Sequence, residues 1–137
     1  MNEGNKNMNH PPKRILIVDD DMLNLRLMVR MLDKTGIEVD QASSGAAALS
    51  MAMKSHYDMI FLDISMPAIG GVTVARSLRQ QLGDRAPRII ACTAQRHFGE
   101  GDSEGEAVHF DDVLTKPFVR PDLLRLVGVE TPDRRRA

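Results

Sequence analysis

Short apolar runs alternate with helix-periodic stretches along this chain. The apolar runs cover residues 15–18, 58–62 and 87–92, and a weaker run covers 112–115. Short continuous apolar runs are typical of strands buried on both faces of a sheet. Residues 37–41 instead alternate apolar and polar side chains, which favours an edge strand. The pattern therefore predicts a sheet made of these strands.

Between the strands, apolar side chains recur with the period of a helix buried on one face. Ser43 and Ser44 are N-cap candidates for an alanine-rich helix that runs to about Lys54, and we expect the first helix to stop at Gly36. The other helix core positions are Leu25, Met28, Met31 and Leu32; Val74, Leu78 and Leu82; and Leu123, Leu124 and Val127. Alternating strands and helices predict an α/β fold with a parallel sheet and right-handed crossovers.

One stretch departs from this alternation. Between residues 96 and 110, where a fourth helix would lie, three glycines are interleaved with acidic residues. Each interior glycine costs roughly 1 kcal/mol of helix stability relative to alanine. We therefore expect a short, frayed or irregular fourth helix.

The length of 137 residues suits one domain. Residues 1–12 lack periodicity and end in two prolines, so we expect a disordered N-terminal tail. The domain is predicted to cover residues 13–128, followed by a flexible basic C-terminal tail over 129–137.

Composition narrows the function only slightly. The formal net charge of -1 provides no general attraction to nucleic acid or membranes, and no apolar stretch is long enough for membrane insertion. The single cysteine, Cys92, falls inside an apolar run, which predicts a buried reduced thiol and fits a cytoplasmic location.

Residues suited to binding a cation or a phosphoryl group follow the predicted strands. Asp19 and Asp20 follow the first buried run, Asp63 ends the second, Thr93 follows the third and Lys116 the weaker fourth. The carboxyl ends of parallel strands lie along one edge, where open sheets bind ligands. Acids, hydroxyl and lysine would then share one crevice that can hold a divalent cation and a phosphoryl group together.

Two polar residues shortly after the first buried run have simpler interpretations. Asp21 directly precedes the first helix, so it is better placed to cap that helix than to bind metal. Asn24 falls on the apolar side of the same helix, which favours a buried, hydrogen-bonded asparagine over a ligand.

Four short motifs, RILIVDDD, FLDISMP, CTA and LTKPF, follow one another along the chain. Together and in this order they resemble the receiver domain of bacterial response regulators in two-component signalling, and the resemblance covers about Arg14 to Val127. It implies a doubly wound five-stranded parallel sheet in the flavodoxin-like order 2-1-3-4-5. It also implies a phosphorelay in which a histidine kinase or histidine phosphotransfer protein donates a phosphoryl group, and a partner-binding face then switches.

The resemblance also assigns roles to the crevice residues. It makes Asp63 the phosphoryl acceptor, Asp19 and Asp20 the acidic pair that holds Mg²⁺, Thr93 the switch hydroxyl and Lys116 the lysine of the motif. Self-phosphorylation and autodephosphorylation would be the only catalytic activities, with no metabolic reaction.

Physical chemistry supports the same assignment. Carboxylates about 4 Å apart repel by several kcal/mol at an effective dielectric near 20, so three acids in one crevice need a counter-cation. Mg²⁺ prefers octahedral oxygen ligands and keeps water, so Asp20, Asp63, a main-chain carbonyl near Ser65, waters and a phosphoryl oxygen would complete its shell.

The sequence departs from the family pattern at two places. Gly70-Gly71 stands where the family usually has an acid before glycine, so we expect a lost helix cap and a more mobile loop. Val113 stands where many receivers carry a tyrosine or phenylalanine that moves on activation. We hypothesise that switching instead orders residues 96–110 when Thr93 moves toward the phosphoryl group.

Two alternatives remain open. One is a small haloacid dehalogenase-type phosphatase with Asp19 as its nucleophile, although Asp63 would then be unexplained. The other is a receiver-like scaffold that takes no phosphate.

No DNA-binding helix pair fits after Val127, so we expect no direct contact with nucleic acid and an unknown downstream protein partner.

Overall fold

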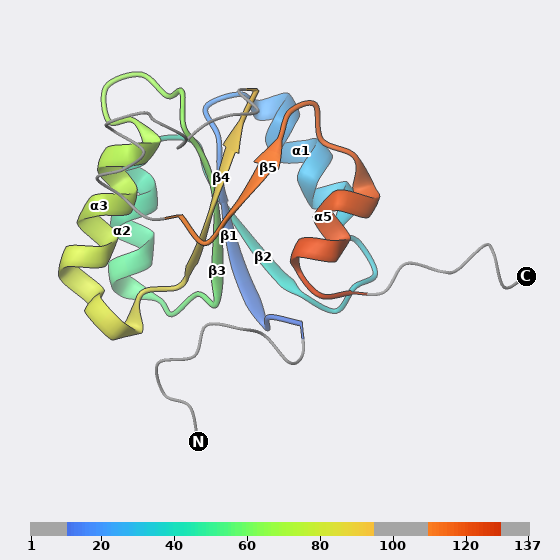
Figure 1. Ribbon diagram of the computed structural model, residues 1–137, viewed down its shortest axis with the longest axis horizontal. Coiled ribbons are helices and arrows are strands. Elements are labelled where there is room, and N and C mark those ends of the chain that lie inside the picture. Colours follow the sequence, from blue (N-terminus) through green and yellow to red (C-terminus); the bar gives the residue numbers. More distant parts are fainter. Residues whose placement is uncertain (1–10, 95–109, 130–137) are drawn as a thin grey trace, which may run out of the picture.

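The computed structural model describes residues 11–94 and 110–129, and within them five strands form one parallel sheet. The sheet order is β2-β1-β3-β4-β5, and each neighbouring pair runs parallel (Figure 1). The predicted fold class and strand order are therefore confirmed. The strands are β1 (Arg14–Val18), β2 (Glu38–Ala42), β3 (Met59–Asp63), β4 (Arg88–Thr93) and β5 (Asp112–Thr115).

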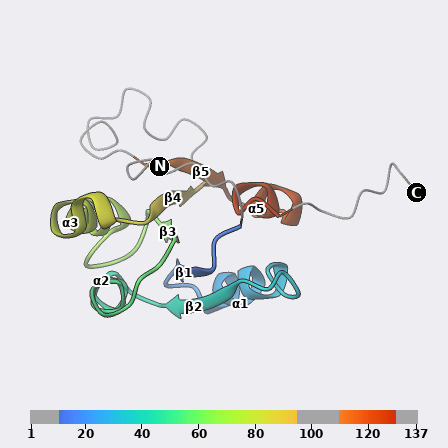
Figure 2. The ribbon, with the colours of Figure 1, turned by 90° about the horizontal axis from the view of Figure 1, so that it is seen from below.

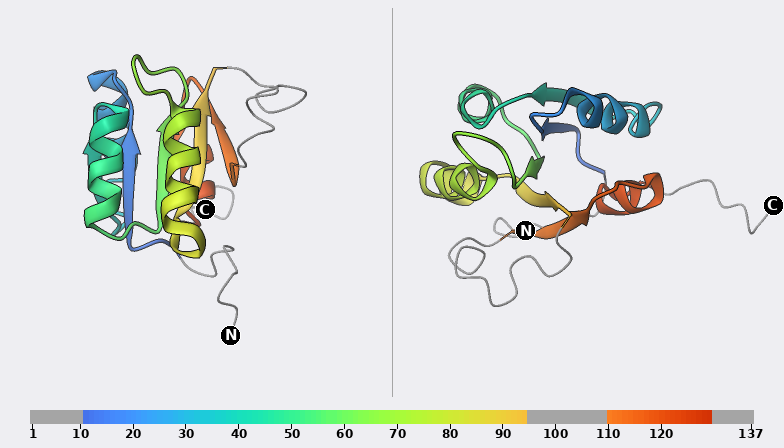
Figure 3. Two further views of the ribbon diagram at one scale, coloured as in Figure 1. Left: turned by 90° about the vertical axis from the view of Figure 1, so that its left-hand side faces the viewer. Right: turned by 90° about the horizontal axis from the view of Figure 1, so that it is seen from above.

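Helices cover both faces of this sheet. Helices α1 and α5 pack on one face and α2 and α3 on the other, as Figure 2 and the view from above in Figure 3 show. In the described part of the chain the helices are α1 (Met22–Met31), α2 (Gly45–Lys54), α3 (Gly71–Leu82) and α5 (Arg120–Leu126), with a 3-10 turn η1 (Gly83–Arg85). The predicted irregular element at 96–110 lies outside the described residues, except for Phe110.

The continuous apolar runs are explained by burial on both faces of the sheet. Along β1, Leu16 and Val18 belong to the core beneath α2 and α3, whereas Ile15 and Ile17 belong to the core beneath α1 and α5. The same alternation continues along β3, whose residues are all buried. Each large side chain such as Phe61 contributes roughly 1.5–3 kcal/mol by leaving water.

Side chains define the starts of the first two helices as predicted. Asp21 caps α1 by accepting a hydrogen bond from the Leu23 N–H at 2.9 Å, and Ser44 caps α2 by accepting one from the Ala47 N–H at 3.1 Å. Each bond satisfies one of the N–H groups that a helix leaves unpaired at its first turn.

The predicted end of α1 at Gly36 is wrong. The helix ends at Met31, and in the turn that follows the Thr35 hydroxyl donates to the Leu32 carbonyl at 2.6 Å. Lys34 has a positive φ of 67° in this turn, and Gly36 lies beyond it with a φ of 82°. The glycine therefore serves the loop rather than the helix end.

A polar cluster joins β1, β2 and the segment before β3. Asp40 on β2 accepts hydrogen bonds from the Arg14 guanidinium at 3.0 Å and from the Tyr57 hydroxyl at 2.6 Å. The guanidinium also lies 5.1 Å from the centre of the Tyr57 ring. Burial, followed by the hydrogen bond and the charge of Asp40, raises the pKa of Tyr57 to about 12.

Three further predictions concern the cysteine, membrane-spanning helices and the domain boundaries. Cys92 is buried as predicted, and burial raises the pKa of its thiol. Within residues 11–94 and 110–129, none of the helices has the length and apolar character needed to cross a membrane. The domain boundaries remain a prediction; the Val129 N–H, just past the predicted end, donates to the Leu124 carbonyl at 3.0 Å.

Candidate phosphoacceptor site

The predicted site residues meet at the carboxyl-terminal edge of the sheet. Asp19 and Asp20 directly follow β1, Asp63 ends β3, Thr93 ends β4 and Lys116 directly follows β5. The parallel register carries these strand ends to the same level, since β1 pairs with β3, β3 with β4 and β4 with β5. Tertiary structure thus brings together residues far apart in sequence.

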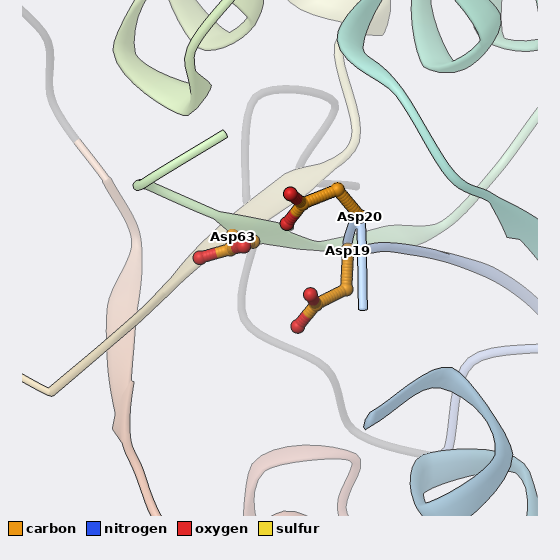
Figure 4. A group of neighbouring side chains, drawn as sticks. All are labelled: Asp19, Asp20 and Asp63. Carbon is orange, nitrogen blue, oxygen red and sulfur yellow. The ribbon is translucent and has the colours of Figure 1, made fainter. Parts of the chain in front are cut away.

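Three carboxylates form the centre of this site. Asp19, Asp20 and Asp63 each offer one oxygen, and these oxygens all lie within 4.8 Å of one another (Figure 4). Asp19 and Asp63 are each only 3% exposed, whereas Asp20 is exposed. Two such charges repel by roughly 3–4 kcal/mol at an effective dielectric near 20, so the group favours a cation.

Asp63 combines burial with an available oxygen. Its Oδ1 lies 3.2 Å from Lys116 Nζ and accepts a hydrogen bond from the Ser65 N–H at 3.2 Å. Among the described residues, its Oδ2 has no hydrogen-bond partner. Burial and the negative charge of Asp19 raise the pKa of Asp63, although the Lys116 charge and the two hydrogen bonds oppose the rise.

Asp19 is held from both sides. Its Oδ1 accepts a hydrogen bond from the Asp21 N–H at 2.9 Å, and its Oδ2 accepts one from Asn24 Nδ2 at 3.2 Å. The same Oδ2 lies 3.4 Å from Lys116 Nζ. Asp19 therefore has no oxygen without a partner, in contrast to Asp63.

Lys116 supplies the positive charge between the two buried carboxylates. Burial disfavours its charged form, but the charges and hydrogen bonds of Asp19 and Asp63 together outweigh that effect and raise the pKa of the lysine. Its main-chain N–H donates to the Thr93 carbonyl at 2.9 Å, and a cis bond joins it to Pro117. Lys116 is thus fixed to the end of β4 as well as to the acids.

The structure places Thr93 and Ser65 at the same edge with different exposure. Thr93 is buried one residue beyond Cys92, which pairs with Asp63 in the sheet register. Ser65 is exposed, and its main-chain N–H contacts Asp63. The predicted metal contact through the Ser65 carbonyl and the switch role of Thr93 stay predictions.

Sequence reasoning interpreted Asn24 correctly as hydrogen-bonded but did not connect it to the site. Its side chain is half-buried rather than buried as expected, and it donates its hydrogen bond to Asp19. The signal was its position on the first turn of α1, because side chains there point back toward the helix start, where Asp19 lies.

The donor set fits Mg²⁺. This cation prefers hard oxygen ligands and keeps several waters, which suits a site with two buried acids and one exposed acid. The acidic group is therefore able to hold a metal ion.

Comparisons with known proteins agree with this geometry. The sequence profile of the family described as response regulator receiver domain matches residues 15–128. The chain is 34% identical over 119 residues to hybrid signal transduction histidine kinase L of Dictyostelium discoideum, a match that covers 83% of this chain and 7% of that protein. The chain thus spans only a small part of the length of this relative and of others such as the sensor protein ArcB of Escherichia coli, of which it covers 15%.

Two similar solved structures contain magnesium. One is the receiver domain of sensor histidine kinase PA1611 from Pseudomonas aeruginosa PAO1, with a magnesium ion coordinated in the active site cleft. The two structures superimpose with a TM-score of 0.73 at 33% sequence identity, and the match covers 84% of this chain and 93% of that chain. The other is TrrA from Thermotoga maritima in complex with Mg(2+)-BeF, with a TM-score of 0.73 at 36% identity, covering 84% of this chain and 96% of that chain. With its profile matched from residue 15 to residue 128, this chain belongs to the response regulator receiver domain family.

Proposed function

We propose that this chain is the phosphoacceptor receiver of a phosphorelay and that Asp63 accepts the phosphoryl group with the help of Mg²⁺. The observation that carries the proposal is the difference between the two buried acids. Asp63 keeps an oxygen without a hydrogen-bond partner among the described residues, while both oxygens of Asp19 accept bonds. A nucleophile needs an available lone pair, so Asp63 is the better acceptor.

The transfer is a displacement at phosphorus. An oxygen of Asp63 forms the new P–O bond as the P–N bond to a donor histidine breaks, and the departing imidazole keeps the electron pair and takes up a proton. Such transfers depend chiefly on positioning and on neutralising the equatorial oxygens. Lys116, 3.2 Å from Asp63, would provide one positive charge for them.

Asp19, Asp20 and Asp63 are the residues that would hold Mg²⁺, with the Ser65 carbonyl as a further ligand. When bound, the cation supplies positive charge that offsets the acids and the phosphoryl oxygens. The buried Thr93 would hydrogen-bond the phosphorylated Asp63 and so report its state to the rest of the domain.

The donor is proposed to be a histidine kinase or a histidine phosphotransfer protein. Receiver domains pair with such proteins, and a curated relative is itself a hybrid histidine kinase. Next to the site, α1 exposes the apolar side chains of Met22, Leu23 and Leu27, with Leu23 70% exposed. An apolar helix surface beside Asp63 suits a helical donor whose histidine must reach that residue.

Intact mass spectrometry tests the proposal. The protein is incubated with Mg²⁺ and acetyl phosphate, and we expect one labile phosphoryl group that is absent in Asp63→Asn and absent without Mg²⁺. Asp122→Asn, which changes an acid on α5 whose side chain is 45% exposed, is the matched control and should be phosphorylated like the wild type. A phosphoryl group retained in Asp63→Asn would contradict the assignment.

The same assay separates the two alternatives. A phosphatase with Asp19 as its nucleophile would lose its covalent intermediate in Asp19→Asn and keep it in Asp63→Asn. A scaffold that takes no phosphate would show no mass increase in any variant. The bonded state of both Asp19 oxygens argues against the phosphatase.

A further inference from the structure

Asn24 and Lys116 share one oxygen of Asp19. Asn24 Nδ2 donates to Asp19 Oδ2 at 3.2 Å, and Lys116 Nζ lies 3.4 Å from that oxygen. The same ammonium lies 3.2 Å from Oδ1 of Asp63. Lys116 is therefore divided between two carboxylates, one of which carries an additional donor.

This additional donor changes how strongly Asp19 attracts the lysine. A side-chain amide on Oδ2 places a partial positive charge at that oxygen and occupies part of its hydrogen-bonding capacity. Asp19 cannot compensate by turning, because its Oδ1 is held by the Asp21 N–H at 2.9 Å. The result is a weaker pull of Asp19 on Lys116 and a larger share of the lysine charge at Asp63.

We propose that Asn24 is a positioning residue that acts through Asp19 and keeps Lys116 close to Asp63. Its effect on phosphorylation rests on the proposed function, whereas its effect on Lys116 does not. Groups that orient a ligand from behind commonly change metal affinity or activity by about 10- to 100-fold. An aspartate at this position would remove the donor and add a fourth acid, and an alanine would only remove the donor.

The position of Lys116 is tested in the metal-free protein by NMR. We expect the ¹³Cε and ¹Hε resonances of Lys116 to shift in Asn24→Ala and in the isosteric Asn24→Asp, and to return toward the wild-type position in Asn24→Gln. Gln81→Ala is the matched control, because it also removes one amide hydrogen bond, at 3.0 Å to Ser77 on α3. Wild-type Lys116 resonances in both Asn24→Ala and Asn24→Asp would overturn the proposal.

Two further measurements separate positioning from a purely structural role. At saturating Mg²⁺, the phosphorylation rate from acetyl phosphate should fall about tenfold in Asn24→Ala and at least as far in Asn24→Asp. Calorimetry with Mg²⁺ alone should show tighter binding by Asn24→Asp, so affinity rises while rate falls. A merely structural asparagine would lower thermal stability without this split, and an unchanged rate despite shifted Lys116 resonances would refute the positioning role.

Failure of this inference is distinguishable from failure of the proposed function. If the wild type takes no phosphoryl group on Asp63, the proposed function fails, and the Lys116 resonances still decide the role of Asn24. If the wild type is phosphorylated and the Asn24 variants match it in rate and resonances, only the role of Asn24 fails.

Discussion

Three consecutive aspartates have different contacts and therefore different tasks. Asp19 is buried and lies 3.4 Å from Lys116, Asp20 is exposed within the acidic group, and Asp21 caps α1 through the Leu23 N–H. Each task follows from the direction in which the chain turns after β1. Burial and the hydrogen-bond donors within reach thus give three identical side chains different roles.

Tyr57 allows a single-residue test, since it is the only tyrosine in the chain. Its pKa rises from an ordinary value near 10 to about 12, so the folded state holds the phenolic proton more tightly. The associated stability is complete below pH 10 and is lost as the pH rises from about 10 to 12, up to about 2 kcal/mol. Near-ultraviolet titration of tyrosinate should give the raised value, and urea unfolding should show the loss.

Tyr57→Phe is the control for this titration, because it keeps the ring over the Arg14 guanidinium and removes the hydroxyl bonded to Asp40. Its unfolding free energy should decline less between pH 10 and 12 than that of the wild type. An identical decline in both proteins would assign the alkaline instability to other groups.

At the scale of elements, the connection from β3 to α3 contains two glycines, of which only Gly71 lacks space for a side chain. A Cβ on Gly71 would lie 2.5 Å from the Asp63 carbonyl oxygen and 2.8 Å from the Ile64 Cα. Gly70 has ordinary space for a Cβ, an extended backbone, and no side-chain cap for α3. Packing against the end of β3 therefore constrains Gly71, whereas Gly70 only leaves α3 without a side-chain cap.

We expect Gly70→Ser to raise the free energy of unfolding by about 0.5–1 kcal/mol, because it adds a cap and reduces the freedom of the unfolded chain. Gly71→Ala should lower it by about 1–3 kcal/mol, because backbone atoms of β3 would have to move. Urea denaturation of both variants provides the measurement. Equal effects at the two positions would show that close packing is not what requires Gly71.

Across the whole molecule, the sheet gathers uncompensated negative charge at one edge. Lys116 neutralises part of the negative charge of Asp19 and Asp63, but among the described residues Asp20 has no basic partner. The fold therefore carries a destabilising cluster that a bound cation relieves. Stability and cation binding would then be coupled through the same three side chains.

Asp20→Asn should stabilise the metal-free protein by about 0.5–1 kcal/mol, because one repelling charge is removed at an exposed position. Mg²⁺ at a hundred times its dissociation constant should stabilise the wild type by about 2.7 kcal/mol and the variant much less. Urea unfolding with EDTA and with Mg²⁺ measures both effects, with Asp122→Asn as the control. A full Mg²⁺ effect in Asp20→Asn would place the cation elsewhere.

The strands and most helices follow from local pattern. Runs such as Ile15–Val18 predicted strands buried on both faces, and the caps at Asp21 and Ser44 were visible from residue type and position. The end of α1 was missed because the chain already turns before Gly36, with a positive φ at Lys34, and lysine does not signal a turn as strongly as glycine does. The prediction for residues 96–110 falls mainly outside the described part of the chain.

By itself, the sequence determined which residues end each strand, because period and residue type are local properties of the chain. It thereby determined which polar side chains would reach the carboxyl-terminal edge of the sheet: those of Asp19, Asp20, Asp63, Thr93 and Lys116. Only the tertiary structure decided how Lys116 is shared between the two buried acids, since the lysine reaches Asp19 and Asp63 from a segment distant in the chain. The hydrogen bonds from Asp21 and Asn24 to Asp19 join residues close in the chain. The contacts of Lys116 with Asp19 and Asp63 exist only once β1, β3 and the segment after β5 are packed together.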